Sequence, residues 1–170
     1  MGSKRKIAKP ILDYICANNP NAKYFFDLFG GGGAISFEAL KRKQFKEVHY
    51  NELNTGIVEL LKKIRKDGVT NEFYRWVTRE DFKKRYKEPT WFGGFLATCW
   101  SFGNNQKDYL YGKEIENDKK FYHDVCVNLC KDSLERLNEL TGANIPEKVF
   151  DIKGVQNRRL FCKKYFNKRF

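Results

Sequence analysis

A carboxylate followed closely by four glycines is the clearest sign of chemistry in this chain. Residues 25–33 read F-F-D-L-F-G-G-G-G, so Asp27 closes an apolar run just before the glycines. The apolar residues are typical of a buried parallel strand, and glycines allow a sharp turn and a close approach of the backbone to a ligand. Gly31 and Gly33 are therefore the expected points of approach.

The residues after the glycines predict a helix. Residues 34–43 place Ile35 and Leu40 on an apolar side and cations in the last turn. A strand, a glycine turn and a helix in this order predict a nucleotide-type ligand at the carboxyl edge of a sheet. The alternative is a glycine-rich surface loop, because glycine patterns often match by chance.

The position of Asp27 favours one kind of nucleotide-type ligand. A dinucleotide or triphosphate would place its pyrophosphate over the turn, where helix amides favour negative charge, and Asp27 would repel it. Asp27 would instead attract an ammonium group, and S-adenosylmethionine joins an adenosine to the ammonium of an amino acid. The sequence also lacks G-x-x-x-x-G-K-S/T, and Ile35 or Ser36 stands where the third small residue of G-x-G-x-x-G belongs.

Glu52 is a second carboxylate in a position that suits the same ligand. Residues 46–50 predict the next strand, and Glu52 follows its end, 25 residues after Asp27. A carboxylate at this point can accept hydrogen bonds from ribose hydroxyls. Asn54 can then cap a helix over residues 55–66. The alternative for Glu52 is an ordinary acid at the start of a helix.

Length and composition indicate a folded domain. The 170 residues suit one domain, or one domain with a small appendage, and 41% hydrophobic with 16% aromatic residues exclude a disordered chain. No apolar run approaches the roughly 18 residues of a membrane span, and we expect no signal peptide. The five scattered cysteines and two histidines form no metal-ligand pattern, so we expect reduced thiols, no metal and a cytoplasmic protein.

Positive charge is concentrated at the two ends of the chain. The net charge is +12, with four cations in residues 1–10 and eight in residues 146–170 against Glu147 and Asp151. A phosphate backbone is the polyanion that such ends favour, because each neutralised phosphate releases counterions. The alternative is solubilising charge that binds nothing.

Residues 90–112 are rich in aromatic side chains and turn formers. The pattern predicts an aromatic hairpin with a polar tip over residues 103–107. Amide side chains can pair with the edge of adenine, lysine can reach guanine or phosphate, and an aromatic ring can stack on an unpaired base. The alternative is a hairpin that only packs on the core. The candidate DNA contacts are Phe102, Asn104, Asn105 and Lys107.

Helical periodicity accounts for much of the remaining chain. Pro10 either bends the first helix or marks its true start, and Gly142 stands past the end of the last one. Residues 146–170 are basic and aromatic without clear periodicity. The predicted helices span residues 3–18, 71–77, 79–86 and 118–140.

Together these residues resemble the DNA adenine methylase family, most closely its phage-type members. Gly2-Ser3-Lys4 is similar to the family's N-terminal G-G/S-K element. Asp27-x-Phe29-x-Gly31-x-Gly33 is similar to its D/E-P-F-x-G-x-G turn, with Leu28 in place of proline. Glu52-x-Asn54 matches its acidic ribose-binding element. Residues 79–82 read R-E-D-F, similar to its R-E-x-F, and residues 100–107 stand where members carry DNA-contacting residues.

The resemblance implies methyl transfer from S-adenosylmethionine to the exocyclic amine of adenine in DNA. It implies an α/β fold, a Rossmann-like methyltransferase half with a mostly helical target-recognition insertion and an incomplete sheet. Residues 1–70 would bind the cofactor, 71–145 would recognise DNA, and 146–170 would form a basic tail leading back toward a catalytic half. The cofactor-binding residues would be Lys4, Asp27, Phe29, Gly31, Gly33 and Glu52.

The sequence departs from the family at the catalytic element, D/N-P-P-Y/F/W. Its polar residue and backbone carbonyl orient the adenine amine, and its aromatic ring stacks on the flipped base. No two of the four prolines are adjacent. The resemblance places the element beyond residue 170, so we expect a chain cut at both ends, inactive alone, whose partner is a second polypeptide or the missing half. The alternatives are a non-catalytic nucleic-acid-binding module and an RNA methyltransferase.

Overall fold

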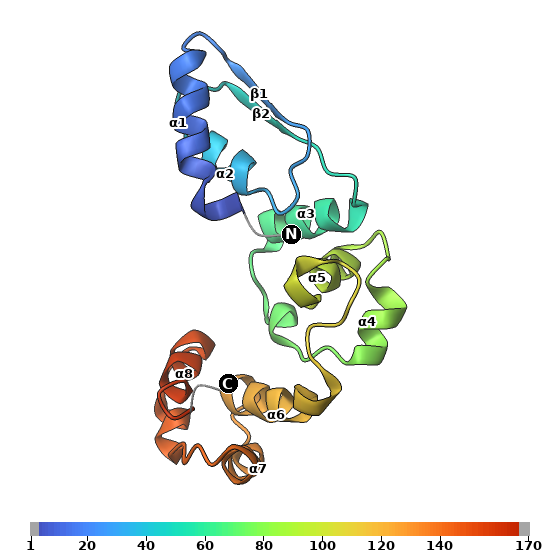
Figure 1. The fold of residues 1–170 in the computed structure, drawn as a ribbon, viewed down its shortest axis with the longest axis vertical. Helices are drawn as coiled ribbons and strands as arrows, with labels where there is room; N and C mark the ends of the chain where they lie inside the picture. Colours follow the sequence, from blue (N-terminus) through green and yellow to red (C-terminus); the bar gives the residue numbers. More distant parts are fainter. Residues whose placement is uncertain (1–3, 167–170) are drawn as a thin grey trace. The chain divides into compact units, whose positions relative to one another are not determined.

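The computed structural model describes residues 4–166, which divide into two compact units. The N-terminal unit contains residues 4–70 and 77–110, and the C-terminal unit contains residues 71–76 and 111–166 (Figure 1). The chain passes between the units after residues 70, 76 and 110, and residues 146–166 pack with the segment that precedes them. The functions assigned to these segments stay predictions.

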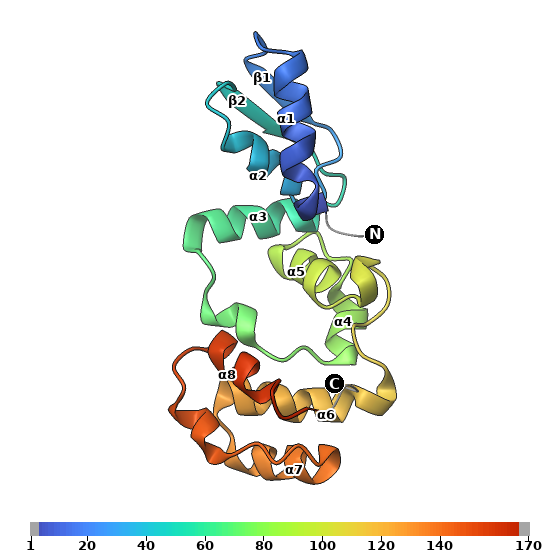
Figure 2. The same ribbon diagram turned by 60° about the vertical axis from the view of Figure 1, so that its left-hand side comes forward.

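A two-stranded parallel sheet lies in the N-terminal unit. β1 (Tyr24–Asp27) pairs with β2 (Glu47–Tyr50), and Asp27 is opposite Tyr50 in the register. α2 (Ala34–Leu40) connects the strands and packs on both, with α1 (Ala8–Asn18) beside it (Figures 1 and 2). A small parallel sheet with a helical crossover is compatible with the expected α/β class.

The two faces of this sheet differ in exposure. Phe25 and Asp27 are half-buried on the face that meets α2, whereas Tyr24 and Phe26 on the other face are exposed. Phe26 stacks on His49 of β2 with ring centroids 4.5 Å apart. The alternation follows from the two-residue period of a strand.

The first helix begins later than predicted. Residues 4–6 form a 3-10 turn and α1 starts at Ala8, which leaves Pro10 in the first turn, where a helix tolerates proline. α3 (Thr55–Asp67) and α4 (Arg79–Arg85) confirm the predicted helices at those positions, and Gly68 ends α3 with a φ of 72°.

The prediction of an aromatic hairpin over residues 90–112 is wrong for its first half. Trp91–Cys99 form the buried helix α5, which Thr90 caps by accepting a hydrogen bond from the Gly93 amide at 3.1 Å. α5 packs so closely on α3 that a Cβ on Gly94 would collide with the backbone carbonyl of Gly56. The apolar and glycine content that suggested a hairpin instead serves this close contact between helices.

The C-terminal unit is helical, and the predicted single helix over residues 118–140 is wrong. α6 (Lys113–His123) runs into a π-helical turn at Asp124–Asn128, and Leu129 then has a φ of 56°, which a continuing helix does not allow. α7 (Lys131–Thr141) follows and ends at Gly142, as predicted. Residues 71–74 form only a 3-10 turn.

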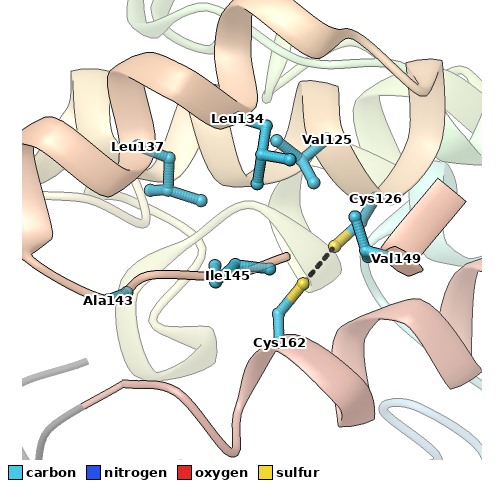
Figure 3. Close-up of a cluster of buried hydrophobic side chains, with 8 residues drawn as sticks. All are labelled: Val125, Cys126, Leu134, Leu137, Ala143, Ile145, Val149 and Cys162. Carbon is cyan, nitrogen blue, oxygen red and sulfur yellow. Dashed lines mark hydrogen bonds between the residues drawn. The ribbon is translucent and has the colours of Figure 1, made fainter. Parts of the chain in front are cut away.

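The basic end of the chain is ordered into the core of this unit, although its sequence lacked clear periodicity. A 3-10 turn (Glu147–Asp151) and α8 (Val155–Cys162) pack against α6 and α7. Figure 3 shows these buried side chains and the contact between Cys126 and Cys162. The Sγ atoms of the two cysteines are 3.9 Å apart. The cluster contains Val125, Cys126, Leu134, Leu137, Ala143, Ile145, Val149 and Cys162.

Candidate functional site

The glycine turn crosses the carboxyl edge of the sheet. The Asn51 amide donates to the Asp27 carbonyl, and the Gly30 amide donates to the Asn51 carbonyl, each at 2.9 Å. These bonds continue the pairing of the strands beyond their ends. The turn therefore lies beside the segment that carries Glu52, as the sequence predicted for two neighbouring parallel strands.

Glu52 and Tyr50 hold the turn at Gly31. One carboxylate oxygen of Glu52 accepts from the Gly31 amide at 2.8 Å and the other accepts from the Asn54 amide at 2.9 Å. The Tyr50 hydroxyl donates to the Gly31 carbonyl at 2.5 Å. Both backbone groups of Gly31 are thus fixed by the end of β2, and its φ of 51° suits glycine.

A hydrogen bond from α2, the helix that follows the turn, holds the side chain of Asp27 in place. Its carboxylate accepts from the hydroxyl of Ser36, a buried residue of α2, at 2.6 Å. No other side-chain hydrogen bond of Asp27 occurs among the described residues. An ionised carboxylate has about four acceptor sites, so Asp27 keeps most of its capacity for a cationic ligand.

Tyr50 lies close to both acids. Burial, and then the charges of Glu52 and Asp27, raise the pKa of its phenol to about 12. The phenol therefore stays protonated and donates to Gly31 at neutral pH. Two carboxylates and one phenol meet below the glycine turn, which is an arrangement suited to an ammonium group and to hydroxyls.

The outer side of the turn is open. A Cβ on Gly30 would collide with the Tyr50 ring, whereas the same atom on Gly31 or Gly32 would meet nothing within 4 Å. Gly33 caps α2 with a φ of 76°. Phe29, 83% exposed, stands beside this open side. A ligand can approach the backbone here.

Lys4 lies in the 3-10 turn that packs on α2, and it is exposed. No hydrogen bond or ion pair joins it to the glycine turn within residues 4–166. Gly2 and Ser3, the rest of the predicted N-terminal element, lie outside the described residues. The role of Lys4 stays a prediction.

The second half of the predicted hairpin is a short loop. Ser101 and Tyr109 form an isolated antiparallel β-bridge, and the Phe102 amide donates to the Asp108 carbonyl at 2.8 Å. Asn105 holds the loop tip, because its side-chain oxygen accepts from the amides of Lys107 and Asp108 at 2.9 Å. All four candidate DNA contacts are exposed, namely Phe102, Asn104, Asn105 and Lys107.

One contact ties this loop to the segment that follows β2. The side-chain nitrogen of Asn54 donates to the side-chain oxygen of Gln106 at 3.0 Å. The side-chain oxygen of Asn54 caps α3 by accepting from the Gly56 amide. A cavity of about 300 Å³ lies at this junction. It is lined by Leu53, Asn54, Thr55, Gly56, Tyr86, Lys87, Pro89 and Gln106.

A comparison with protein families identifies the chain. The model of the D12 class N6 adenine-specific DNA methyltransferases matches residues 1–154. The chain belongs to this family. Searches of curated proteins and of solved structures find no match. The D12 match includes the acidic glycine turn and the loop at residues 101–109, and it ends just before α8.

Sequence reasoning missed three residues of this candidate site in the D12 methyltransferase chain. The sequence placed Tyr50 in a strand without giving it a further role. It used Ser36 only to reject a phosphate-binding motif, and it treated Gln106 only as part of the polar loop tip. The hydrogen bonds that give them roles join residues 9 to 52 positions apart, and no local pattern reveals such contacts.

The described part of the chain contains no helix long and apolar enough to cross a membrane. Residues 4–166 likewise bring no three His, Cys, Asp or Glu side chains together in a way that could hold a metal ion.

Proposed function

We propose that the N-terminal unit binds S-adenosylmethionine at the glycine turn and that the chain serves methyl transfer to the exocyclic amine of adenine in DNA. Family membership supports the reaction and the DNA substrate. The observation that carries the cofactor is the meeting of Asp27, Glu52 and the open glycine turn at one sheet edge.

The chain's own residues have distinct parts in this proposal. Asp27 pairs with the ammonium group of the cofactor, and Ser36 holds the carboxylate in place. Glu52 accepts hydrogen bonds from the ribose hydroxyls while its amide contacts keep the turn in shape. The bound cofactor supplies the methyl group. Lys4 and Phe29 approach it from the open side.

The loop at residues 101–109 contacts DNA. Phe102, 65% exposed, presents a ring for stacking, and Asn104 and Lys107 present polar groups. Asn105 acts chiefly by shaping the loop, since its amide is engaged with the loop itself. These 170 residues contain no D/N-P-P-Y/F/W element, so the proposal assigns no catalytic residue within them.

Titration calorimetry with S-adenosylhomocysteine tests the cofactor site. The wild-type chain should bind it saturably, and D27N should weaken binding most. E47Q is the matched control, because Glu47 is an exposed acid of β2 that pairs with His49 away from the turn. Absence of binding to the wild-type chain, together with normal DNA binding, would instead favour a non-catalytic nucleic-acid-binding module.

A further inference from the structure

A pocket in the C-terminal unit collects cations and aromatic rings. Its volume is about 350 Å³, and it lies between α6 and α8. Three of its residues are Lys or Arg, and no Asp or Glu lines it. The lining residues are Tyr111, Lys119, Tyr122, His123, Gln156, Arg159, Leu160 and Lys163.

The pocket walls are fixed by contacts behind them. Trp76 stacks on Tyr111 with ring centroids 5.6 Å apart, and it meets His123 edge-on. The Tyr122 hydroxyl donates to the Arg159 carbonyl at 3.1 Å, which ties α8 to α6. The pocket is thus part of the packed unit, not a gap between loose side chains.

Two neighbouring arginines of α8 have different roles: Arg158 anchors the helix and Arg159 lines the pocket. Arg158 is buried and donates to the carbonyls of Cys126 at 2.6 Å and Ile152 at 2.8 Å. This anchoring sets the rotation of α8, so that Arg159 lies on the pocket. Arg159 and His123 both line the pocket. Burial lowers the pKa of His123, and the charge of Arg159 lowers it further.

We propose that this pocket binds a phosphate of the DNA backbone together with part of its nucleotide. Three cations without a lining acid attract an anion, and the volume exceeds that of a phosphate alone. Aromatic walls suit the attached sugar or base. The inference rests on the proposed function, because that function makes DNA the polyanionic partner. α8, which carries Arg159 and Lys163, lies outside the family match, whereas the α6 side of the pocket lies within it.

A charge-matched pair of double variants of the full chain tests the pocket. R159Q/K163Q removes two cations that line it, and K153Q/K164Q removes two exposed cations that do not. Fluorescence anisotropy with a labelled 20-base-pair duplex should show about tenfold weaker binding for the first pair and less than threefold for the second. The slope of log affinity against log salt should also flatten by about one for the first pair. Equal losses in both pairs would overturn the proposal.

Proton NMR gives a second readout, because the chain has only two histidines. The groups that act on His123 are Asp124, which raises its pKa, and Arg159 and Lys120, which lower it. Bound phosphate should raise the pKa of His123 and leave that of His49, in the other unit, unchanged. An unchanged His123 pKa at saturating duplex would count against the pocket.

Two further measurements separate the ligand sources and the two proposals. Micromolar binding of deoxyadenosine monophosphate, with DNA affinity unaffected in R159Q/K163Q, would replace the DNA assignment by a free nucleotide. Calorimetry with S-adenosylhomocysteine reports on the N-terminal unit alone. If the chain binds S-adenosylhomocysteine but both double variants lose the same DNA affinity, only the pocket proposal is refuted. If R159Q/K163Q alone loses DNA affinity and the chain does not bind S-adenosylhomocysteine, only the cofactor proposal is refuted.

Discussion

The two units of the chain build polar sites in opposite ways. In the N-terminal unit, Asp27 and Glu52 accept hydrogen bonds from groups of their own fold and face a glycine turn that is open outward. In the C-terminal unit, Arg159 and Lys119 stand among aromatic rings with no acid lining the pocket. Acceptors at an exposed backbone suit ammonium and hydroxyl groups, and cations among rings suit a nucleotide phosphate. This difference underlies the two proposals, a cofactor in the N-terminal unit and a nucleic-acid phosphate in the C-terminal unit.

The largest expected effect is a loss of stability in the C-terminal unit that leaves the N-terminal unit folded. R158M removes a buried guanidinium that donates to two carbonyls, and it should lower the free energy of unfolding of the C-terminal unit by about 3 kcal/mol. Chemical denaturation followed by circular dichroism measures the loss. Binding of S-adenosylhomocysteine should persist. Loss of that binding would show that the N-terminal unit depends on the other for its fold.

The next effect concerns the acid that has most acceptor capacity left. D27A should lower the affinity for S-adenosylhomocysteine by roughly 30-fold, about 2 kcal/mol, because it removes the partner of a charged ammonium. E52A should cost less, since ribose hydroxyls are neutral. Calorimetry on both variants decides the order, and a greater loss in E52A would reassign the leading role to Glu52.

Tyr50 offers a smaller effect with a pH signature. Y50F removes one hydrogen bond to Gly31 and should weaken cofactor binding by about fivefold, or about 1 kcal/mol. The folded-state pKa is raised, so the stabilisation from this phenol is complete below about pH 10 and is lost as the pH rises through about 12.

Thermal melting between pH 9 and 12 checks this pH signature. Wild-type stability should fall more steeply than that of Y50F over this range. Parallel curves for the two proteins would mean that Tyr50 does not titrate differently on folding.

The smallest effect lies in the exposed loop. K107Q should weaken duplex binding only two- to threefold and reduce the salt slope by about one, because an exposed lysine contributes a single phosphate contact. Anisotropy titrations at several salt concentrations measure both. N105A should cost more than K107Q, since Asn105 shapes the loop tip, and the reverse order would mean that loop shape matters little.

Local patterns predicted the N-terminal elements well because their signals are local. The strand before Asp27, the glycine turn after it and the Asn54 cap each depend on a few neighbouring residues. The expected burial of that strand is wrong, because Tyr24 and Phe26 are exposed. The errors arose where distant packing outweighs local preference. Residues 91–99 form a helix that packs with Gly94 against Gly56, and the helix predicted over residues 118–140 is interrupted at Leu129.

The sequence by itself determined the family, and it set one acid before a glycine turn and a second after the next strand, which is the charge pattern on which the proposed cofactor rests. Only the tertiary structure decided that Tyr50 and Ser36 hold the edge in place, that Gln106 meets Asn54, and that Arg159 joins Lys119 around a pocket. Side chains far apart in the sequence meet only when helices and strands pack, and the direction in which each one points depends on that packing.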